Sequence, residues 1–184
     1  MITEEQIKEL LKGTGDNPER TGLIDTPKRV VRMFKEIYKG YDLEQRPKVT
    51  TFPNGEDGVM QDQMVIDTGY YYSQCEHHMV PFFGEYYFAY IPKETIVGIS
   101  KISRLVDWYS AKLQVQERLT QQIVDDLQET LKPLGIMLVM KGRHLCKEMR
   151  GTKKHNAPMI TSYMTGIFKN DSDARNEFLK LIQL

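Results

Sequence analysis

The sequence has few of the residues that would place it outside the cell or in a membrane. Its 184 residues include only two cysteines, Cys75 and Cys146, too few for the disulfide framework of a small secreted protein. The chain does not open on a basic-then-apolar leader, and it contains no apolar run that approaches membrane-spanning length. These absences predict a soluble, cytoplasmic protein whose thiols stay reduced.

An excess of charge of one sign is also absent. The 25 Lys and Arg residues balance 25 Asp and Glu residues, so the formal net charge is zero. This balance predicts that neither nucleic acid nor a membrane surface is a partner. An anionic ligand would therefore have to be bound by a local cluster of basic side chains. The sequence shows no internal repeat, and its length suits one domain with a substantial core.

The spacing of apolar residues predicts an α+β protein with an antiparallel sheet. Helices are expected after the capping-box sequence 3–6, from an N-cap at Thr26 to about residue 39, around 100–109, from about 114 to 131, and after Asp171. Strands are expected at 64–73, 82–91, 134–141 and 160–168. The first two strands would form a hairpin whose connection carries the first cysteine.

Each cysteine lies close to histidines in the sequence. Cys75 is followed by His77 and His78, and Cys146 is preceded by His144. Zinc prefers thiolate and imidazole ligands, and a catalytic zinc keeps three protein ligands and a water molecule. A turn can bring Cys75 and His78 to one ion, and Cys146 would be the third ligand. The two remaining histidines would then lie beside the metal and could move protons.

The same spacing leaves two other interpretations open. A structural zinc site would use four ligands, with His77 or His144 added to the other three. Alternatively, both cysteines are reduced core residues with hydrogen-bonded histidines nearby, because free cysteine is often buried. Only the three-ligand site would hold a water molecule and lower its pKa enough for hydrolytic chemistry near neutral pH.

A pair of arginines is a second candidate feature. Arg29 and Arg32 are three positions apart on the second predicted helix, so they share one face. A solvated basic face is the ordinary explanation for such a pair. In a chain without net charge, however, an anionic substrate would need local basic side chains of this kind. This requirement favours an anion-binding interpretation if the substrate carries phosphates.

Five blocks of the sequence together resemble the GTP cyclohydrolase I family over almost the full length of the chain. The blocks are 17–23 with 26–29, then 75–78, 98–104, 114–120, and 144–146 with 149–151. The resemblance implies the tunnelling fold, an antiparallel sheet with helices layered on one face, over residues 46–184. Residues 1–45 would form an N-terminal helical segment. It also implies rings that assemble into a homodecamer with active sites shared between subunits.

The resemblance further implies roles for individual residues. The zinc ligands would be Cys75, His78 and Cys146. The catalytic residues would be His77, His144 and Ser100. The substrate-binding residues would be Glu117 and Gln116 at the guanine edge, with Lys101, Arg104, Arg150, Arg29 and Arg32 around the ribose and triphosphate. The implied reaction converts GTP to 7,8-dihydroneopterin triphosphate and formate.

The residue types suit this reaction. The carboxylate of Glu117 can accept two parallel hydrogen bonds from a guanine ring nitrogen and its amino group, a donor pair that adenine lacks. His144 would protonate the departing ring nitrogen, and His77 would serve the later steps. Two alternatives are a zinc-stabilised scaffold that binds a purine without turnover and another tunnelling-fold enzyme. The intact set of ligands and histidines disfavours both.

Overall fold

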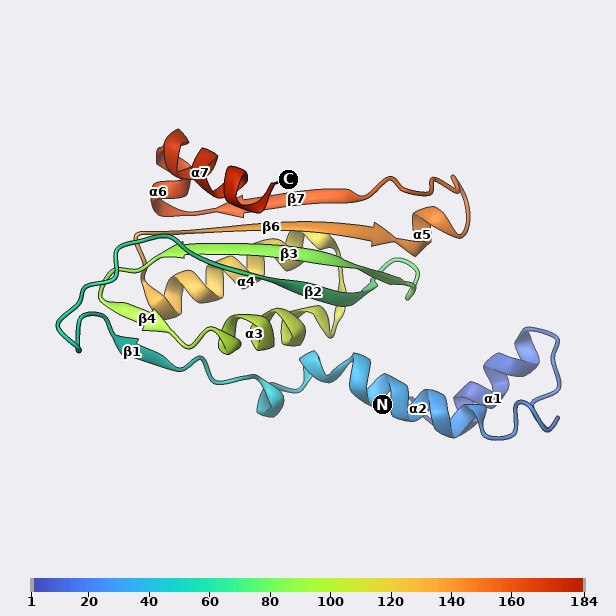
Figure 1. The fold of residues 1–184 in the computed structure, drawn as a ribbon. Coiled ribbons are helices and arrows are strands. Elements are labelled where there is room, and N and C mark those ends of the chain that lie inside the picture. The colour runs from blue at the N-terminus through green and yellow to red at the C-terminus, as the bar shows by residue number, and fades with distance from the viewer. Residues whose placement is uncertain (1, 184) are drawn as a thin grey trace.

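The chain folds around a five-stranded sheet, shown in Figure 1 in a computed structural model that describes residues 2–183. The strand order is β5-β2-β3-β6-β7. The bounds are β2 Val65–Cys75, β3 Pro81–Ile91, β5 Leu113–Gln114, β6 Gly135–His144 and β7 Met159–Met164. The four longer strands pair antiparallel, as expected, whereas β5 pairs parallel with β2. The expected antiparallel pairing is therefore confirmed for the four predicted strands, and the two-residue β5 adds a parallel edge that was not predicted.

Helices α3 (Ser100–Ser110) and α4 (Gln116–Leu131) cover one face of the sheet. Their apolar stripes pack on alternate residues of the strands, and this main core includes Leu105, Leu119, Ile123, Leu127, Tyr86, Phe88 and Leu138. The predicted helix from about 114 to 131 is thus confirmed, and its buried apolar residues include Leu119, Ile123, Leu127 and Leu131. The helix ends where Lys132 adopts a left-handed backbone (φ 47°). The next residue is Pro133, which cannot continue a helix, so the helix ends where the sequence predicts.

Two C-terminal helices, α6 (Gly166–Asn170) and α7 (Ser172–Ile182), pack on the opposite face. They form a second, smaller core, in which Phe168 and Phe178 lie against Ala89 of β3 and Val139 of β6. Helices therefore cover both faces, and the expectation of one helical face is only partly right. The predicted strand 160–168 is also too long. Gly166 has a left-handed backbone (φ 53°), which turns the chain into α6.

The N-terminal helices are α1 (Glu4–Gly13) and α2 (Thr26–Ile37), which pack together and extend beyond the sheet (Figure 1). The predicted capping box is confirmed, because the Thr3 hydroxyl accepts from the Gln6 amide at 3.3 Å and the Gln6 side chain accepts from the Thr3 amide at 2.9 Å. The second helix begins one residue earlier than predicted, with Asp25 as N-cap and Thr26 inside the first turn.

A short irregular region joins these helices to the sheet. It contains the 3₁₀ turns η1 (Lys39–Tyr41) and η2 (Leu43–Gln45), and strand β1 (Thr51–Pro53), which pairs with β4 (Thr95–Val97). The amide of Gly40 donates to the carbonyl of Ala111 at 3.0 Å, and a side chain at position 40 would overlap the carbonyl of Trp108. A glycine is therefore required where this region meets α3. Among residues 2–183, no helix combines the length and apolarity needed to cross a membrane.

Candidate functional site

Three neighbouring strands place the two cysteine–histidine segments at one end of the sheet. Cys75 is the last residue of β2, and β6 ends at His144, two residues before Cys146. Between them, Phe82 of β3 pairs in register with Ser73 on one side and with His144 on the other. The register therefore brings the two segments together although they are far apart in sequence.

The connection between β2 and β3 folds back onto Cys75. The carbonyl of Cys75 accepts from the amide of Met79 at 2.7 Å, and Met79 has a left-handed backbone (φ 55°). This tight turn places the Nδ1 atoms of His77 and His78 each 3.8 Å from the Cys75 sulfur. Both imidazoles are thus held beside the first thiol by local backbone geometry.

The third predicted ligand comes from the short helix α5 (Leu145–Glu148), which follows β6. One ligand atom from each of Cys75, His78 and Cys146 lies within 4.8 Å of the others. Ligands of a tetrahedral zinc, bound at about 2.0–2.3 Å, are about 3.3–3.8 Å apart, so small side-chain movements would close the group on an ion. Both thiols are free, and two thiols with one imidazole are a donor set that suits zinc.

The proximity of the two cysteines makes the Cys146 thiol harder to deprotonate. The pKa of the Cys146 thiol is raised, first by burial and then by the hydrogen bond and charge of Cys75. Two adjacent thiolates without a cation would repel each other, so the second proton is held more tightly. A divalent cation would remove this repulsion, because metal binding requires deprotonated thiolates. The arrangement therefore fits a metal centre better than a pair of inert core cysteines.

A hollow of about 190 Å³ opens beside the metal-ligating group. Six of its lining residues were predicted as site residues: Cys75, His77, Gln116, Glu117, His144 and Cys146. Small-molecule pockets usually have volumes of about 300–1,000 Å³, so this hollow is only part of a site for a nucleotide. A second hollow of about 730 Å³, lined by Phe34, Tyr38 and Leu113 among others, lies next to the N-terminal helices.

His144 is held from its face and from its edge. Its ring stacks on Phe82 with 4.7 Å between ring centroids and an angle of 7°. Its Nε2 atom lies 2.9 Å from the side-chain oxygen of Gln116. Burial lowers the pKa of His144, and the nearby negative charge of Glu117 acts in the opposite direction. A histidine with fixed orientation in a half-buried hollow is well placed to exchange a proton with a ligand.

Gln116 lies deeper than its predicted role at the guanine edge suggests. It is completely buried, and its amide already has partners inside the protein. The nitrogen donates to the carbonyls of Met140 and Met159 and to the hydroxyl of Thr161, at 2.9–3.1 Å, while the oxygen accepts from Tyr71 at 3.0 Å. Its side chain therefore supports the wall of the hollow.

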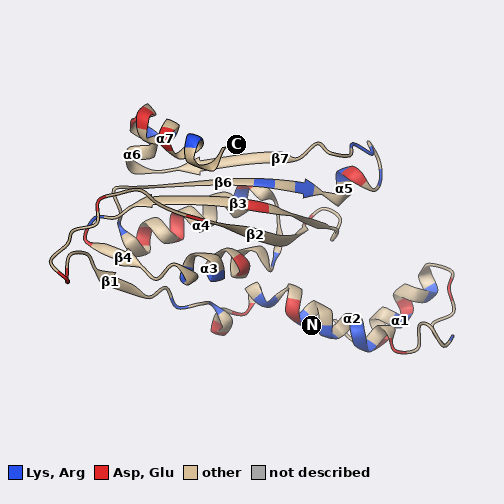
Figure 2. Ribbon diagram, viewed as in Figure 1, with Lys and Arg blue, Asp and Glu red and all other residues tan. Residues whose placement is uncertain are grey.

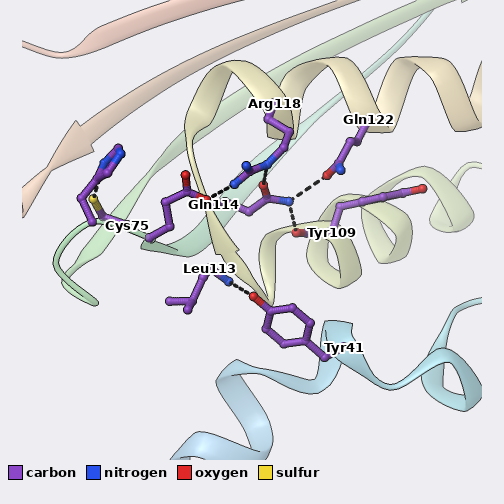
Figure 3. A network of polar contacts seen from close by, with 9 residues as sticks. Tyr41, Cys75, Tyr109, Leu113, Gln114, Arg118 and Gln122 are labelled. Carbon is purple, nitrogen blue, oxygen red and sulfur yellow. Dashed lines mark hydrogen bonds and ion pairs between the residues drawn. The ribbon is translucent and has the colours of Figure 1, made fainter.

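A polar network missed by the sequence analysis supports the metal-binding loop (Figure 3). Arg118 donates to the carboxylate of Glu76, the residue after Cys75, and to the side-chain oxygen of Gln114 at 3.0 Å. The Gln114 nitrogen continues the network to the side-chain oxygen of Gln122 at 3.0 Å. The Arg118 guanidinium lowers the pKa of Glu76, which keeps that carboxylate ionised. Glu76 and Arg118 are 42 positions apart, so no local pattern in the sequence indicates this network.

The predicted site residues Ser100, Lys101 and Arg104, at the start of α3, lie away from the hollow. The hydroxyl of Ser103 is 3.2 Å from a carboxylate oxygen of Asp67, which fixes the start of α3 beside the beginning of β2. Cys75 is eight positions farther along that strand, about 26 Å at 3.3 Å per residue. Within one chain these three residues are not brought together with the metal-ligating group.

The remaining basic residues are exposed. Arg29 and Arg32 lie on α2, and the side chain of Arg29 is 70% exposed and 3.4 Å from Asp25. Arg150 is exposed in the turn after α5. Figure 2 shows basic residues on α2 and at the end of β6, in two separate parts of the chain. None of these three arginines lines the hollow of about 190 Å³ formed within residues 2–183.

Comparison with known proteins gives one family. The family model described as GTP cyclohydrolase I matches residues 3–183. GTP cyclohydrolase 1 of Wolinella succinogenes is 44% identical over 176 residues, which cover 96% of this chain and 93% of the relative. The Leptospira biflexa protein of the same name is 46% identical over 182 residues, covering 98% and 97%. That of Helicobacter pylori strain G27 is 42% identical over 180 residues, covering 98% and 99%.

These matches extend over nearly the complete chain, and they include every strand and helix that forms the candidate site. Sequence identity above 40% over such a length is far beyond what a shared fold alone produces. The chain belongs to the GTP cyclohydrolase I family of enzymes.

Proposed function

We propose that this enzyme opens the imidazole ring of GTP by hydrolysis, releases formate and rearranges the ribose to give 7,8-dihydroneopterin triphosphate. The observation that carries the proposal is the group formed by Cys75, His78 and Cys146 beside a hollow lined by Glu117 and His144. It combines a metal centre for hydrolysis, a carboxylate for purine recognition and a histidine for proton transfer. The product would enter pterin and folate synthesis.

Zinc is the metal we propose for this group. Cys75, His78 and Cys146 would hold it, and the fourth position would be left to water. When bound, zinc would lower the pKa of a water molecule and so supply the nucleophile that attacks the carbon between the two imidazole nitrogens. The donor set of two thiols and one imidazole supports this choice over magnesium or calcium, which prefer oxygen ligands.

Two histidines would move the protons. His144 would protonate the ring nitrogen that departs when the imidazole opens, because its fixed ring lines the hollow. His77, which also lines the hollow, would act in ring opening and in the later sugar steps. Ser100 is the third proposed catalytic residue, and it would have to act from a second copy of the chain.

Guanine would be recognised by Glu117 in the first turn of α4. Glu117 lines the hollow, and its carboxylate could accept from both the ring N–H and the exocyclic amine of guanine. Adenine lacks this donor pair and would leave the carboxylate without partners, so ATP would be rejected. Gln116, one residue earlier, would shape the same wall from its buried position.

The site would be completed by a neighbouring subunit. A single chain offers a hollow of only about 190 Å³, and the start of α3 is about 26 Å from Cys75 along β2. We propose a homodecamer in which a second copy brings Lys101, Arg104, Arg29 and Arg32 to the triphosphate. Arg150, two residues after the helix that carries Cys146, would contribute from the same chain as the metal ligands. The exposed edge strand β7, whose Ile160 is 57% exposed, supports assembly, because open sheet edges favour pairing.

The direct test is incubation of the purified, metal-loaded protein with GTP. Formate release should accompany pterin absorbance and, after oxidation, pterin fluorescence. ATP is the control substrate, and His144→Ala is the control variant, which should bind GTP without forming product. GTP binding by the parent protein without formate would instead identify a purine-binding scaffold. We place the activity in the cytoplasm, where two free thiols remain reduced.

A further inference from the structure

A chain of hydrogen bonds leads from the buried face of the sheet to the proposed proton-transfer residue. The hydroxyl of Tyr71 donates to the Gln116 side-chain oxygen at 3.0 Å, and the same oxygen lies 2.9 Å from Nε2 of His144. Tyr71 and Gln116 are completely buried, so water does not compete for the bond between them, whereas the bond to His144 lies at the half-buried edge of the hollow. The three side chains come from β2, α4 and β6.

The orientation of the Gln116 amide is determined by its other partners. Its nitrogen lies 2.9 Å and 3.1 Å from the carbonyl oxygens of Met140 and Met159, which can only accept. The amide oxygen must therefore face Tyr71 and His144. Because this oxygen is also only an acceptor, both neighbours must donate to it. The neutral His144 ring then carries its proton on Nε2, and Nδ1 holds the lone pair.

Gly142 provides the space in which this arrangement fits. In the sheet register, Tyr71 pairs with Gly84 on β3, and Gly84 pairs with Gly142 on β6. A Cβ atom at position 142 would overlap both the Tyr71 hydroxyl and the Gln116 side-chain oxygen. The backbone of Gly142 does not itself require glycine, because it lies within a regular strand. The absence of a side chain here is therefore explained by the hydrogen bonds that pass over it.

We propose that Tyr71, acting through Gln116, is a positioning residue that fixes the ring orientation and tautomer of His144. The inference rests on the proposed function, in which His144 exchanges a proton with GTP. Phe82 restrains the face of the ring, and Gln116 restrains its edge. The Tyr71 hydroxyl holds the Gln116 oxygen in place from inside the core. Because Nε2 is then occupied by its bond to Gln116, Nδ1 would be the His144 nitrogen that exchanges a proton with GTP. Tyr71 would have this effect without touching the substrate.

The kinetic test is Tyr71→Phe, which removes the hydroxyl and keeps the ring. Loss of one buried hydrogen bond that acts on the transition state should lower kcat for GTP about three- to tenfold. KM and bound metal should not change. The matched control is Tyr72→Phe, the next residue on the same strand, whose side chain points to the other face and is 70% exposed. A kcat within twofold of this control, or a change confined to KM, would overturn the proposal.

A spectroscopic test does not depend on turnover. Solid-state ¹⁵N spectra of the metal-loaded protein, labelled at histidine and assigned with His144→Ala, report which ring nitrogen is protonated whatever the size of the assembly. The parent protein should show His144 with the proton on Nε2, and Tyr71→Phe should show a mixture of tautomers. A proton on Nδ1 in the parent would refute the positioning role, even in an active enzyme. The expected tautomer in a protein that does not convert GTP would refute the proposed function alone.

Gly142→Ala tests the same contacts from β6, two strands away from Tyr71 in the sheet. The added methyl group should displace the Tyr71 hydroxyl and lower kcat by a similar factor. In the Tyr71→Phe background, where the hydroxyl is already absent, Gly142→Ala should lower kcat by a clearly smaller factor than it does in the parent. Fully additive losses would show that the two positions do not act through one hydrogen bond. If Gly142→Ala does not fold, the kinetic and spectroscopic results for Tyr71→Phe decide the proposal.

Discussion

The guanidinium of Arg118 on α4 binds the carboxylate of Glu76 on the β2–β3 connection. This ion pair links the helix whose first turn holds Glu117 to the end of β2 and the following loop, which carry two of the three metal ligands. The side chains of both partners are only partly exposed, 43% and 33%, and Gln114 supports the arginine from the other side. The metal-binding loop is therefore held by contacts beyond its own turn.

Removal of this support should weaken metal binding. In Arg118→Ala, the loop that presents Cys75 and His78 loses its connection to α4, and we expect the affinity for zinc to fall about 10- to 100-fold, as is usual for residues that orient metal ligands. Competition with a chromogenic chelator measures this change. Arg20→Ala, which breaks an exposed ion pair with Asp16, is the control and should keep the parent affinity. Equal affinities in both variants would contradict the supporting role of Arg118.

The metal ligands can be tested one at a time. Cys146→Ser should lose both the metal and the release of formate from GTP, because a hydroxyl does not replace a thiolate in this donor set. Atomic emission of the purified variant gives the metal content, and circular dichroism shows whether the fold is retained. A folded Cys146→Ser protein with one zinc per chain would rule out Cys146 as a ligand.

Glu117 should determine the choice of purine. Glu117→Gln replaces one acceptor with a donor, and the loss of a charge-assisted hydrogen bond should cost about 1.5–3 kcal/mol of GTP binding, roughly 10- to 100-fold in affinity. Equilibrium binding of GTP to the metal-loaded protein measures this change. Glu129→Gln, a substitution near the far end of α4, is the matched control. Comparable turnover of ATP and GTP by the parent protein would refute the assignment.

Shared sites make a prediction about mixed assemblies. A chain with Arg29→Ala and Arg32→Ala would lack the proposed phosphate contacts, and a chain with His144→Ala would lack the proton donor. Reassembly of the two should restore part of the activity that each lacks, because some sites would combine an intact part from each chain. Activity should also fall on dilution as the assembly dissociates. Light scattering that shows a fully active monomer, or no recovery in verified mixed assemblies, would contradict a shared site.

Much of the fold could be predicted because local patterns and tertiary contacts agree. The strands β2 and β3, the helix α4 and the capping box at Thr3 all appear where the sequence indicates. The predicted strand end at Ile167 and Phe168 was wrong, because a short apolar run has no period that separates strand from helix. The parallel contact of β5 also had no local signal, because two residues are too few to show one.

The candidate site could be predicted where it depends on residue type, but not where it depends on register. Thiols and imidazoles indicate a metal wherever they meet, so Cys75, His78 and Cys146 could be named in advance. The contact between Tyr71 and Gln116 joins residues 45 positions apart and exists only because α4 packs in one particular way on the aligned strands β2, β3 and β6. For the same reason, the distance between the start of α3 and the cysteines was not evident before the strands were placed.

The overlap that a side chain at position 142 would produce has an evolutionary consequence. As long as a tyrosine occupies position 71, its hydroxyl and the Gln116 oxygen fill the space above Gly142, so even alanine there meets a steric barrier. A lineage that first replaces Tyr71 with a shorter residue removes one of the two overlaps, leaves that with the Gln116 oxygen, and so lowers the cost of a side chain at 142. The order in which these two substitutions can be fixed is therefore constrained, and positions 71 and 142 should vary together among descendants of this protein.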